Sequence, residues 1–203
     1  LRYDDINKVG LYATRARARL STTREDAVKQ RSAALYAQAN TQWTETVRTV
    51  VGMRGDVFDV DVASNDPANS GSDVAVRPSP KVSVALGPWA RTEVYLNYGW
   101  GFHSNDARGA TITRDPITGD PADPVDLLVR ARGAEVGVRT LAFPGVHATA
   151  AWWGLDVDSE LLFVGDGGST EASRPSRRRG LEITADYAPR PWLKLDASYA
   201  FSK

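Results

Sequence analysis

The stretch "ARTEVYLNYGWGF", residues 90–102, alternates between two kinds of side chain almost without interruption. One parity is mainly apolar or aromatic and comprises Ala90, Thr92, Val94, Leu96, Tyr98, Trp100 and Phe102; the other is charged, polar or small and comprises Arg91, Glu93, Tyr95, Asn97, Gly99 and Gly101. Successive side chains of a β-strand point to opposite faces. The stretch therefore predicts a long strand with one apolar face and one polar face.

The composition limits the class of protein. The 203 residues include 25 basic and 25 acidic side chains, a balance that argues against a general nucleic-acid-binding surface. The chain has no cysteine, which excludes a disulfide framework and a thiolate metal site. No run approaches the roughly 18 apolar residues of a transmembrane helix, whereas the strands of a transmembrane barrel need only alternate.

The two-residue period recurs along the chain, and none of these windows fits the 3.6-residue period of a helix. Examples are "PKVSVALG" (80–87), "GLEITADY" (180–187) and "LKLDASYAF" (193–201). The pattern predicts nine strands, at 6–19, 31–43, 46–58, 80–88, 91–103, 126–140, 146–157, 178–188 and 191–202. The fold class expected is all-β.

The connections between these strands alternate in length. Short turns are expected near residue 45 and at 87–90, 141–145 and 188–192. Long polar loops rich in Gly, Pro, Asn, Asp and Ser are expected at about 20–30, 59–79, 103–125 and 158–177. All short turns then lie at one end of the sheet and all long loops at the other, which predicts an antiparallel up-and-down topology.

The aromatic residues favour a sheet in a membrane. Trp43, Trp89 and Trp192 lie beside short turns, whereas Tyr98, Trp100 and Phe102 lie near a long-loop end. Two aromatic bands with aliphatic residues between them are typical of a barrel in lipid. The alternative is a soluble all-β binding module with long specificity loops, whose apolar face would form a core. The long strands and the strict alternation of turn lengths favour the membrane barrel.

Several segments resemble the barrel of TonB-dependent outer-membrane receptors. They are "VYLNYGWGFHSNDARG" (94–109), "VVGMRGDVFDVDV" (50–62), "LLVRARGAEVGVRT" (127–140) and "WWGLDVDSELLFVGDGGSTEASRPSRRRGLEI" (152–183). The resemblance implies a segment of a barrel that has 22 strands in this family. Residues 1–203 are then part of one barrel domain without its plug domain, and the open sheet belongs to a longer protein.

The resemblance also implies the function. A receptor of this family is a transporter of the Gram-negative outer membrane and not an enzyme; it takes up scarce nutrients such as ferric siderophores, haem or cobalamin. The partners implied are the TonB protein, an N-terminal plug domain, outer-membrane lipid and lipopolysaccharide, and a small-molecule or metal-chelate ligand. No nucleic acid, cofactor or bound metal is expected.

Two sets of site residues follow from the predicted faces and loops. The polar face is expected to line the lumen and contact the plug through Arg48, Arg54, Asp56, Arg91, Glu93, Glu135, Arg139 and Glu182. The alternative for these residues is a solvated lumen with ion pairs of small individual value. Ligand contacts are expected at the extracellular mouth from His103, Asn105, Asp106, Arg108, Arg177 and Arg178. The arginines of "RPSRRRG" (174–180) suit an anionic ligand or lipopolysaccharide phosphates, or alternatively pair with acids such as Glu182.

Two chemical sites are weaker alternatives. Asp156, Asp158 and Glu160 alternate on one face, and "DPITGD" (115–120) is a second acidic cluster, but neither matches a calcium-binding loop and solvated acids are the simpler interpretation. A hydrolase triad of Ser104, His103 and Asp106 is disfavoured because triad members converge from separate segments. "GDGGS" (165–169) has no lysine and no following helix, so it predicts a turn and not a phosphate loop.

Overall fold

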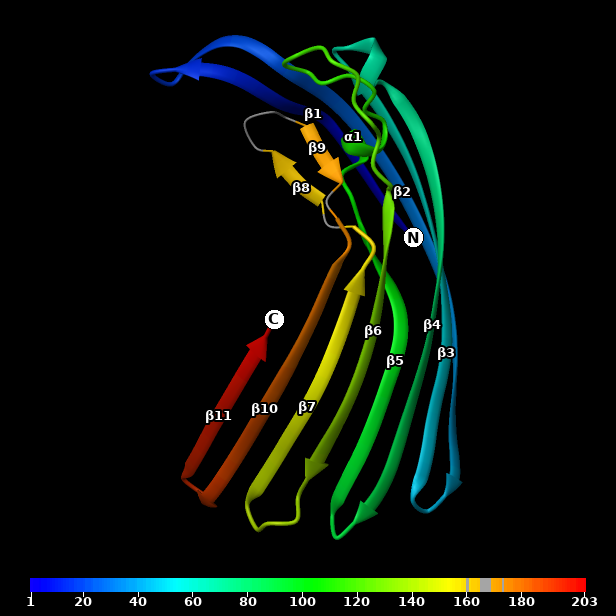
Figure 1. The fold of residues 1–203 in the computed structure, drawn as a ribbon, viewed down its shortest axis with the longest axis vertical. Coiled ribbons are helices and arrows are strands. Elements are labelled where there is room, and N and C mark those ends of the chain that lie inside the picture. Colours follow the sequence, from blue (N-terminus) through cyan, green and yellow to red (C-terminus); the bar gives the residue numbers. More distant parts are fainter. Residues whose placement is uncertain (160, 165–168, 173) are drawn as a thin grey trace.

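The computed structural model describes residues 1–159, 161–164, 169–172 and 174–203. Nine antiparallel strands form one curved sheet (Figure 1). They are β1 (Arg2–Arg15), β2 (Ala18–Thr44), β3 (Val47–Ser64), β4 (Gly71–Trp89), β5 (Thr92–Ser104), β6 (Leu128–Thr140), β7 (Val146–Val157), β10 (Ser176–Arg190) and β11 (Leu193–Ser202). Their order in the sheet is the order in the chain, so the predicted all-β, up-and-down topology is confirmed.

The sheet is open in the part of the chain that the structure describes. β1 pairs only with β2, and β11 pairs only with β10. The connection between β7 and β10 contains a separate hairpin of β8 (Leu161–Val164) and β9 (Ser169–Ala172). The four predicted short turns lie together at the lower end in Figure 1. In the described ranges, no helix is long and apolar enough to cross a bilayer.

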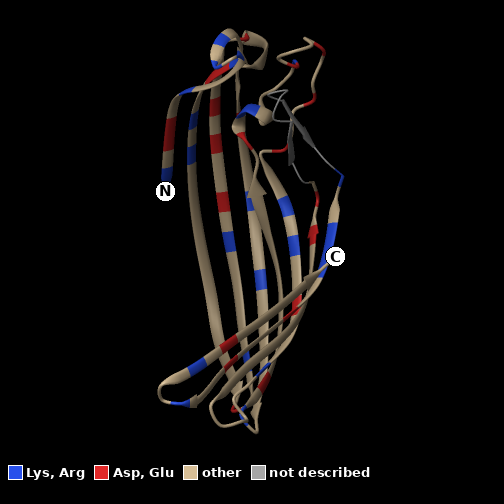
Figure 2. Ribbon diagram, turned by 90° about the vertical axis from the view of Figure 1, so that its left-hand side faces the viewer, with Lys and Arg blue, Asp and Glu red and all other residues tan. Residues whose placement is uncertain are grey.

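The predicted loop at 20–30 is wrong, because these residues belong to β2 and pair with β1. The connection is instead the tight turn at Ala16 and Arg17, whose φ angles of 48° and 66° suit a two-residue hairpin. β2 carries six charged residues between 19 and 31 and none between 32 and 44, and Figure 2 shows charge gathered on the upper parts of the long strands. The upper part of β2 resembles a loop in composition because it has no apolar face, yet its backbone pairs with β1 and, from Asp26 on, with β3.

The predicted loop at 59–79 is also too long. β3 continues to Ser64 and β4 begins at Gly71, which leaves a connection of six residues that contains the 3₁₀ turn η1 (Pro67–Asn69). Asp66 caps this turn by accepting a hydrogen bond from the backbone of Ala68 at 3.0 Å. The other long connection, 105–127, contains the short helix α1 (Ala107–Ala110).

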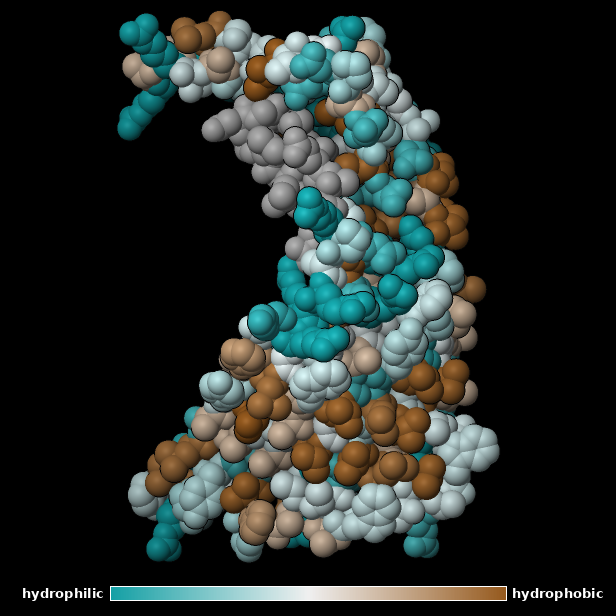
Figure 3. Space-filling view, viewed as in Figure 1, coloured by the Kyte–Doolittle hydropathy of each residue, from teal (hydrophilic) through white to brown (hydrophobic). Residues whose placement is uncertain are grey.

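The register assigns each side chain to one of two faces. We call the face that carries Val94, Leu96 and Tyr98 the outer face, and the face that carries Glu93, Tyr95 and Asn97 the inner face. Pairing aligns apolar residues on the outer face across neighbouring strands. One such row is Val84, Leu96, Val136, Trp152, Leu181 and Phe201. Figure 3 shows a broad apolar band over the lower half of the molecule.

Nothing in the described ranges covers this band. Leu96, Ile183 and Leu195 keep 44%, 41% and 51% of their surface exposed. A soluble module would bury the same side chains against a second layer, as its hydrophobic core requires. The outer face therefore has the pattern of a barrel wall in lipid, and the alternative of a soluble sandwich does not fit it.

Among the described residues, the conventional core lies in the upper half, on the inner face. Val60, Val62 and Val28 are buried there beneath Leu127 from the 105–127 connection and Leu128, the first residue of β6. Phe58 and Phe102 pack edge to face at the margin of this cluster, with ring centroids 5.8 Å apart. The connection is thus a packed insert against the inner face of β2 and β3, which we call the folded loop.

Candidate functional site

The inner face of the lower half carries a three-membered ion cluster. Glu93 on β5 accepts hydrogen bonds from Arg48 on β3 at 2.5 Å and from Arg139 on β6 at 2.7 Å. These side chains come together because alternate residues of paired strands share a face, although β4 lies between β3 and β5. Arg48 and Arg139 border a hollow of about 690 Å³ that is also lined by Asn40, Ser83, Tyr95 and His147.

Other predicted lumen residues lie along the same face at different heights. Arg54 and Asp56 form a bidentate pair with distances of 2.7 and 2.8 Å, and Asp56 is only 3% exposed. Glu182 accepts a hydrogen bond from the indole Nε1 of Trp153 at 3.1 Å. Glu135 pairs across the sheet with Asn97 and Trp153. The inner face therefore carries both positive and negative side chains, several of them held in place by hydrogen bonds.

Arg91 occupies a different position from the other lumen residues. It forms the turn between β4 and β5 with Ala90, and both residues have positive φ angles. Its carbonyl accepts a hydrogen bond from the backbone of Leu141 at 2.9 Å. Arg91 thus lies at the short-turn rim, outside the strand ladder that forms the wall.

Four predicted ligand residues build the folded loop from within. Asn105 is buried, donates from its amide to the Asp126 carbonyl at 2.6 Å and lies 2.9 Å from the His103 ring. Asp106 is the N-cap of α1 and also binds the Arg108 guanidinium at 2.6 Å. These polar groups are therefore engaged in folding the base of the loop, and each has less capacity left for a ligand.

The electrostatics of Asp106 and Arg108 support this structural role. Burial raises the pKa of Asp106, but hydrogen bonds from the side chain and backbone of Arg108 outweigh it, and the net pKa is lowered. The hydrogen bond to Asp106 raises the pKa of Arg108. Both groups are thus held in their charged forms.

A buried ion pair anchors the folded loop to β2, and sequence reasoning missed it. Arg24 and Asp26 are 3% and 1% exposed, and Arg24 Nε lies 2.6 Å from the Asp26 carboxylate. Arg24 also donates to the Arg108 carbonyl at 3.1 Å. The signal was "TREDAV" (23–28), in which Arg24, Asp26 and Val28 share a parity, but most of these residues were assigned to a loop at 20–30.

Asn69 is a second anchor that the sequence did not reveal. Its side-chain oxygen accepts from the backbones of Thr113 and Arg114, both at 3.0 Å, and its amide donates to the Arg114 carbonyl. The side chain of this fully buried asparagine thus satisfies backbone groups of Thr113 and Arg114 that would otherwise need a backbone partner. The η1 turn and the folded loop are thereby joined.

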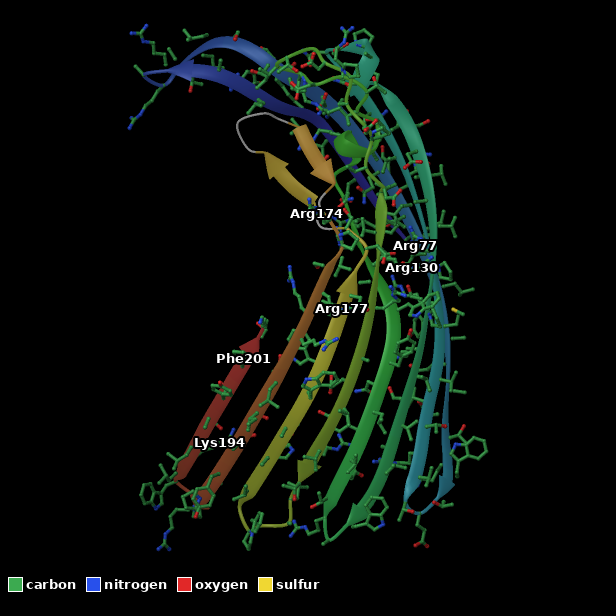
Figure 4. The ribbon with its side chains drawn as sticks, viewed as in Figure 1. Arg77, Arg130, Arg174, Arg177, Lys194 and Phe201 are labelled. Atoms are coloured by element: carbon green, nitrogen blue, oxygen red, sulfur yellow. The ribbon has the colours of Figure 1, made fainter. Side chains whose placement is uncertain are left out.

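Arg177 and Arg178 lie on opposite faces of β10. Arg177 pairs with Asp156 of β7 on the outer face, with 2.7 Å between Arg Nε and the carboxylate. Arg178 has the parity of Glu182, which places it on the inner face. Figure 4 shows Arg177 on the upper part of β10, below Arg174. The two arginines therefore do not form one site.

The acidic clusters are occupied by partners within the protein. Asp156 pairs with Arg177 and Asp158 lies 3.8 Å from Arg132, while Glu160 lies outside the described residues. Asp115 accepts from the backbones of Thr118 and Ile117, and these bonds lower its pKa. Within the described ranges, no group of three or more His, Cys, Asp or Glu side chains could hold a metal ion. Of "GDGGS", only Ser169 is described.

Comparison with known families decides the identity of this sheet. The model described as "TonB dependent receptor-like, beta-barrel" matches residues 1–203. The chain belongs to this family. The predicted resemblance to TonB-dependent receptors is thus confirmed, and with it the outer membrane of Gram-negative bacteria as the location of the barrel. No curated protein matches the chain.

Solved structures of receptors share the fold of this barrel segment. The alcaligin outer-membrane receptor FauA of Bordetella pertussis is 15% identical with a TM-score of 0.62, over 88% of this chain and 31% of that one. The copper transporter OprC is 19% identical with a TM-score of 0.65, over 89% and 29%. The haemophore receptor HasR of Serratia marcescens, solved with its haemophore HasA and haem, is 17% identical with a TM-score of 0.67, over 87% and 34%. This chain spans about a third of their length.

The receptor fold also bears on the hydrolase alternative. The similar structures are receptors and transporters, which fits the prediction that the chain is not an enzyme. His103 contacts Asn105, whereas Asp106 binds Arg108. A relay from Asp106 through His103 to Ser104 is therefore not formed.

Proposed function

We propose that this chain is part of the barrel of an outer-membrane transporter that takes up a scarce nutrient, with energy supplied through the TonB protein. The observation that carries the proposal is the two-faced sheet: an uncovered apolar outer face and a charged inner face in one family of receptor barrels. A wall of this kind separates lipid from a polar passage. The ligand class favoured is a ferric siderophore or a similar metal chelate.

Further strands would complete the barrel in the full-length protein. β1 and β11 each leave one edge without a partner among the described strands. An unpaired edge exposes backbone N–H and C=O groups, whose cost in a bilayer is several kcal/mol each. We propose that residues 1–203 are one part of a single barrel domain and that a plug domain fills its lumen.

The Glu93 cluster is the contact proposed for the plug. Arg48 and Arg139 keep 40% and 50% of their side chains exposed while both bind Glu93, which is 17% exposed. The carboxylate holds two guanidinium groups in fixed directions, and each retains donors that face the hollow. Such preorganised donors suit carboxylates or carbonyl groups on a plug surface. Arg54 and Glu182 would extend this contact along the inner face.

The mouth of the transporter is proposed to be shaped by the folded loop. His103 and Arg108 already bond to Asn105 and Asp106, so only their remaining hydrogen-bond donors could contact a ligand. Arg178 lies on the inner face of β10 and is a further candidate for such contact. Lipid and lipopolysaccharide are proposed to surround the outer face.

Uptake by cells tests this proposal. A strain that depends on the full-length gene should lose growth on one or more ferric chelates under iron limitation when the gene is deleted. Growth should also be lost when tonB is deleted. In each deletion strain, growth should return when the deleted gene is restored. Uptake of the same chelate that persists without TonB would contradict the proposal that TonB supplies the energy.

The combined substitution Arg48→Gln and Arg139→Gln tests the proposed plug contact. It should weaken retention of the plug, measured as increased passive entry of a large antibiotic.

A further inference from the structure

The outer face changes character abruptly above the apolar band. The row Leu96, Val136, Trp152, Leu181 and Phe201 is entirely apolar or aromatic. The next rows up the same face bring in Arg179 with Lys203, then Arg132, Asp156 and Arg177. Residues two apart on a strand are separated by about 7 Å. The first cations, Arg179 and Lys203, therefore lie two residues, or about 7 Å, beyond the last apolar row.

These residues form a positively charged belt across β6, β7, β10 and the end of β11. Its four cationic side chains are Arg132, Arg177, Arg179 and Lys203, and its two carboxylates are Asp156 and Asp158, which gives a net charge of +2. We call this set the basic belt. Figure 3 shows it as a hydrophilic zone directly above the apolar band.

The internal contacts of the basic belt leave cationic capacity unused. Asp156 pairs with Arg177, and Asp158 lies 3.8 Å from Arg132, a distance longer than a hydrogen bond. Arg130, on the same strand as Arg132, is not part of the belt, because its Nε is buried and its guanidinium carbon lies 5.1 Å from the centroid of the Trp100 ring. Arg179 and Lys203 join β10 and β11 by reciprocal backbone bonds of 2.8 and 2.9 Å, and both side chains are exposed.

The position of the basic belt identifies its partner. The belt lies on the face that contacts lipid, at the long-loop end, and borders the aromatic residues Tyr98 and Trp100. The headgroups of the leaflet at this end lie at that level. Only a partner with dense negative charge next to acyl chains matches both the belt and the apolar band below it. Guanidinium groups bind phosphate oxygens through paired hydrogen bonds.

We propose that the basic belt is a binding site for a phosphorylated glycolipid of the outer leaflet, of the lipid A type. The inference rests on the membrane orientation in the proposed function and adds the site and its ligand. Arg179, Lys203 and Arg132 bind the phosphates, while the acyl chains lie along Leu181, Phe201 and Trp152. Arg177 is oriented by Asp156 and borders the same site.

Binding of a defined lipid to the purified full-length receptor tests the site. The probe is bisphosphorylated lipid A in detergent, with the bound lipid counted by native mass spectrometry. The double substitution Arg179→Gln and Lys203→Gln should weaken binding at least about tenfold, because each removes a charge-assisted hydrogen bond. Arg178→Gln is the matched control, since Arg178 adjoins Arg179 on the same strand but lies on the inner face, and it should bind lipid A as the wild type does.

A second lipid separates phosphate recognition from contact with the acyl chains. Lipid A without its phosphates should bind wild-type receptor at least about tenfold more weakly, and equally to wild type and to the double variant. The proposal is overturned if the double variant binds lipid A normally, if Arg178→Gln weakens binding as much, or if loss of the phosphates has no effect. Should the double variant not fold, the two lipids on the wild type decide. If the double variant instead loses a co-purified protein and still binds lipid A normally, the belt binds a protein partner and the lipid proposal is overturned. Uptake is measured separately, so failure here leaves the transport proposal standing.

Discussion

Both halves of β3 alternate apolar and polar residues, but the apolar residues lie on opposite faces of the sheet in the two halves. In the lower half Val51 and Met53 point to the outer face and are 55% and 52% exposed. In the upper half Val60 and Val62 point to the inner face and are 0% and 2% exposed. The pairing with β2 and β4 continues through this region without a register shift. The apolar set therefore changes face at Val57 and Phe58 while the backbone continues.

This difference shows that two environments act on one strand. Below the change, lipid can solvate apolar side chains on the outer face, so no protein layer is needed there. Above it, water contacts the outer face, and the hydrophobic effect favours burial on the inner face beneath the folded loop. The change of face thus marks the level at which β3 leaves the membrane.

The largest effect is expected from damage to the core of the upper half. Leu128→Ala removes a fully buried side chain from the contact with Val60 and Val62. The free energy of opening the folded loop should fall by about 2–5 kcal/mol. Amide hydrogen exchange of residues 105–127 in the full-length protein measures it. Leu20→Ala, at an exposed position of upper β2, should change this free energy by less than about 0.5 kcal/mol.

A charge on the outer face of the lower half should have the next largest effect. Ile183→Arg places a guanidinium in lipid and should destabilise the barrel by about 2–4 kcal/mol if the site is near the midplane. Thr184→Arg, the next residue on the inner face, is the control and should cost much less. Equilibrium unfolding in detergent–lipid mixtures measures both. Equal costs would mean that the two faces do not differ in environment.

Acid should loosen the upper half through Asp106. Because the pKa of this carboxyl is lowered in the folded state, its contribution is complete above the ordinary carboxyl pKa of about 3.9 and is lost as the pH falls through the lowered value. Pepsin cleavage within 105–127 should therefore rise as the pH is lowered below about 4. Asp106→Asn should remove this step. Asparagine caps a helix about as well as aspartate, so at neutral pH the variant loses only the ion pair with Arg108, at a cost of about 0.2–1 kcal/mol.

The smallest effect is expected from the ion cluster in the lower half. Glu93→Gln leaves Arg48 and Arg139 without their shared carboxylate, but both guanidinium groups remain half-exposed. The free energy of unfolding should fall by about 0.2–1 kcal/mol, and the difference from wild type should shrink in high salt. A loss that is unchanged by salt would mean that the cluster is shielded from water.

The sequence predicted the lower half well because the lipid imposes a strict pattern on it. The alternation at 91–103 and 146–157 gave β5 and β7 to within one residue at each end. The upper half was predicted poorly for the opposite reason. At 20–30 neither parity is consistently apolar, so backbone pairing with β1 left no signal in the side chains.

The site residues divide along the same boundary. Glu93 and Arg139 could be assigned to one face from parity alone, and the structure places them in contact. The partners of Arg108 and Asn105 could not be predicted, because Arg24 and Asp126 meet them through the tertiary path of the folded loop. The change of face in "DVFDVDV" (56–62) was a readable signal, since both parities hold valine but in different halves.

The most direct test of the account asks what each face of the lower half contacts. The chain has no cysteine, so single cysteines at Leu96, Val136 and Ile183, and at Asn97, Glu135 and Thr184, can each carry a spin label in the full-length receptor in liposomes. Collision of the label with oxygen, which concentrates in lipid, and with a water-soluble nickel chelate is then measured. The account predicts high oxygen access at the first three sites and low oxygen access at the second three. Low oxygen access at Leu96, Val136 and Ile183 would show that protein covers the outer face and would contradict the account.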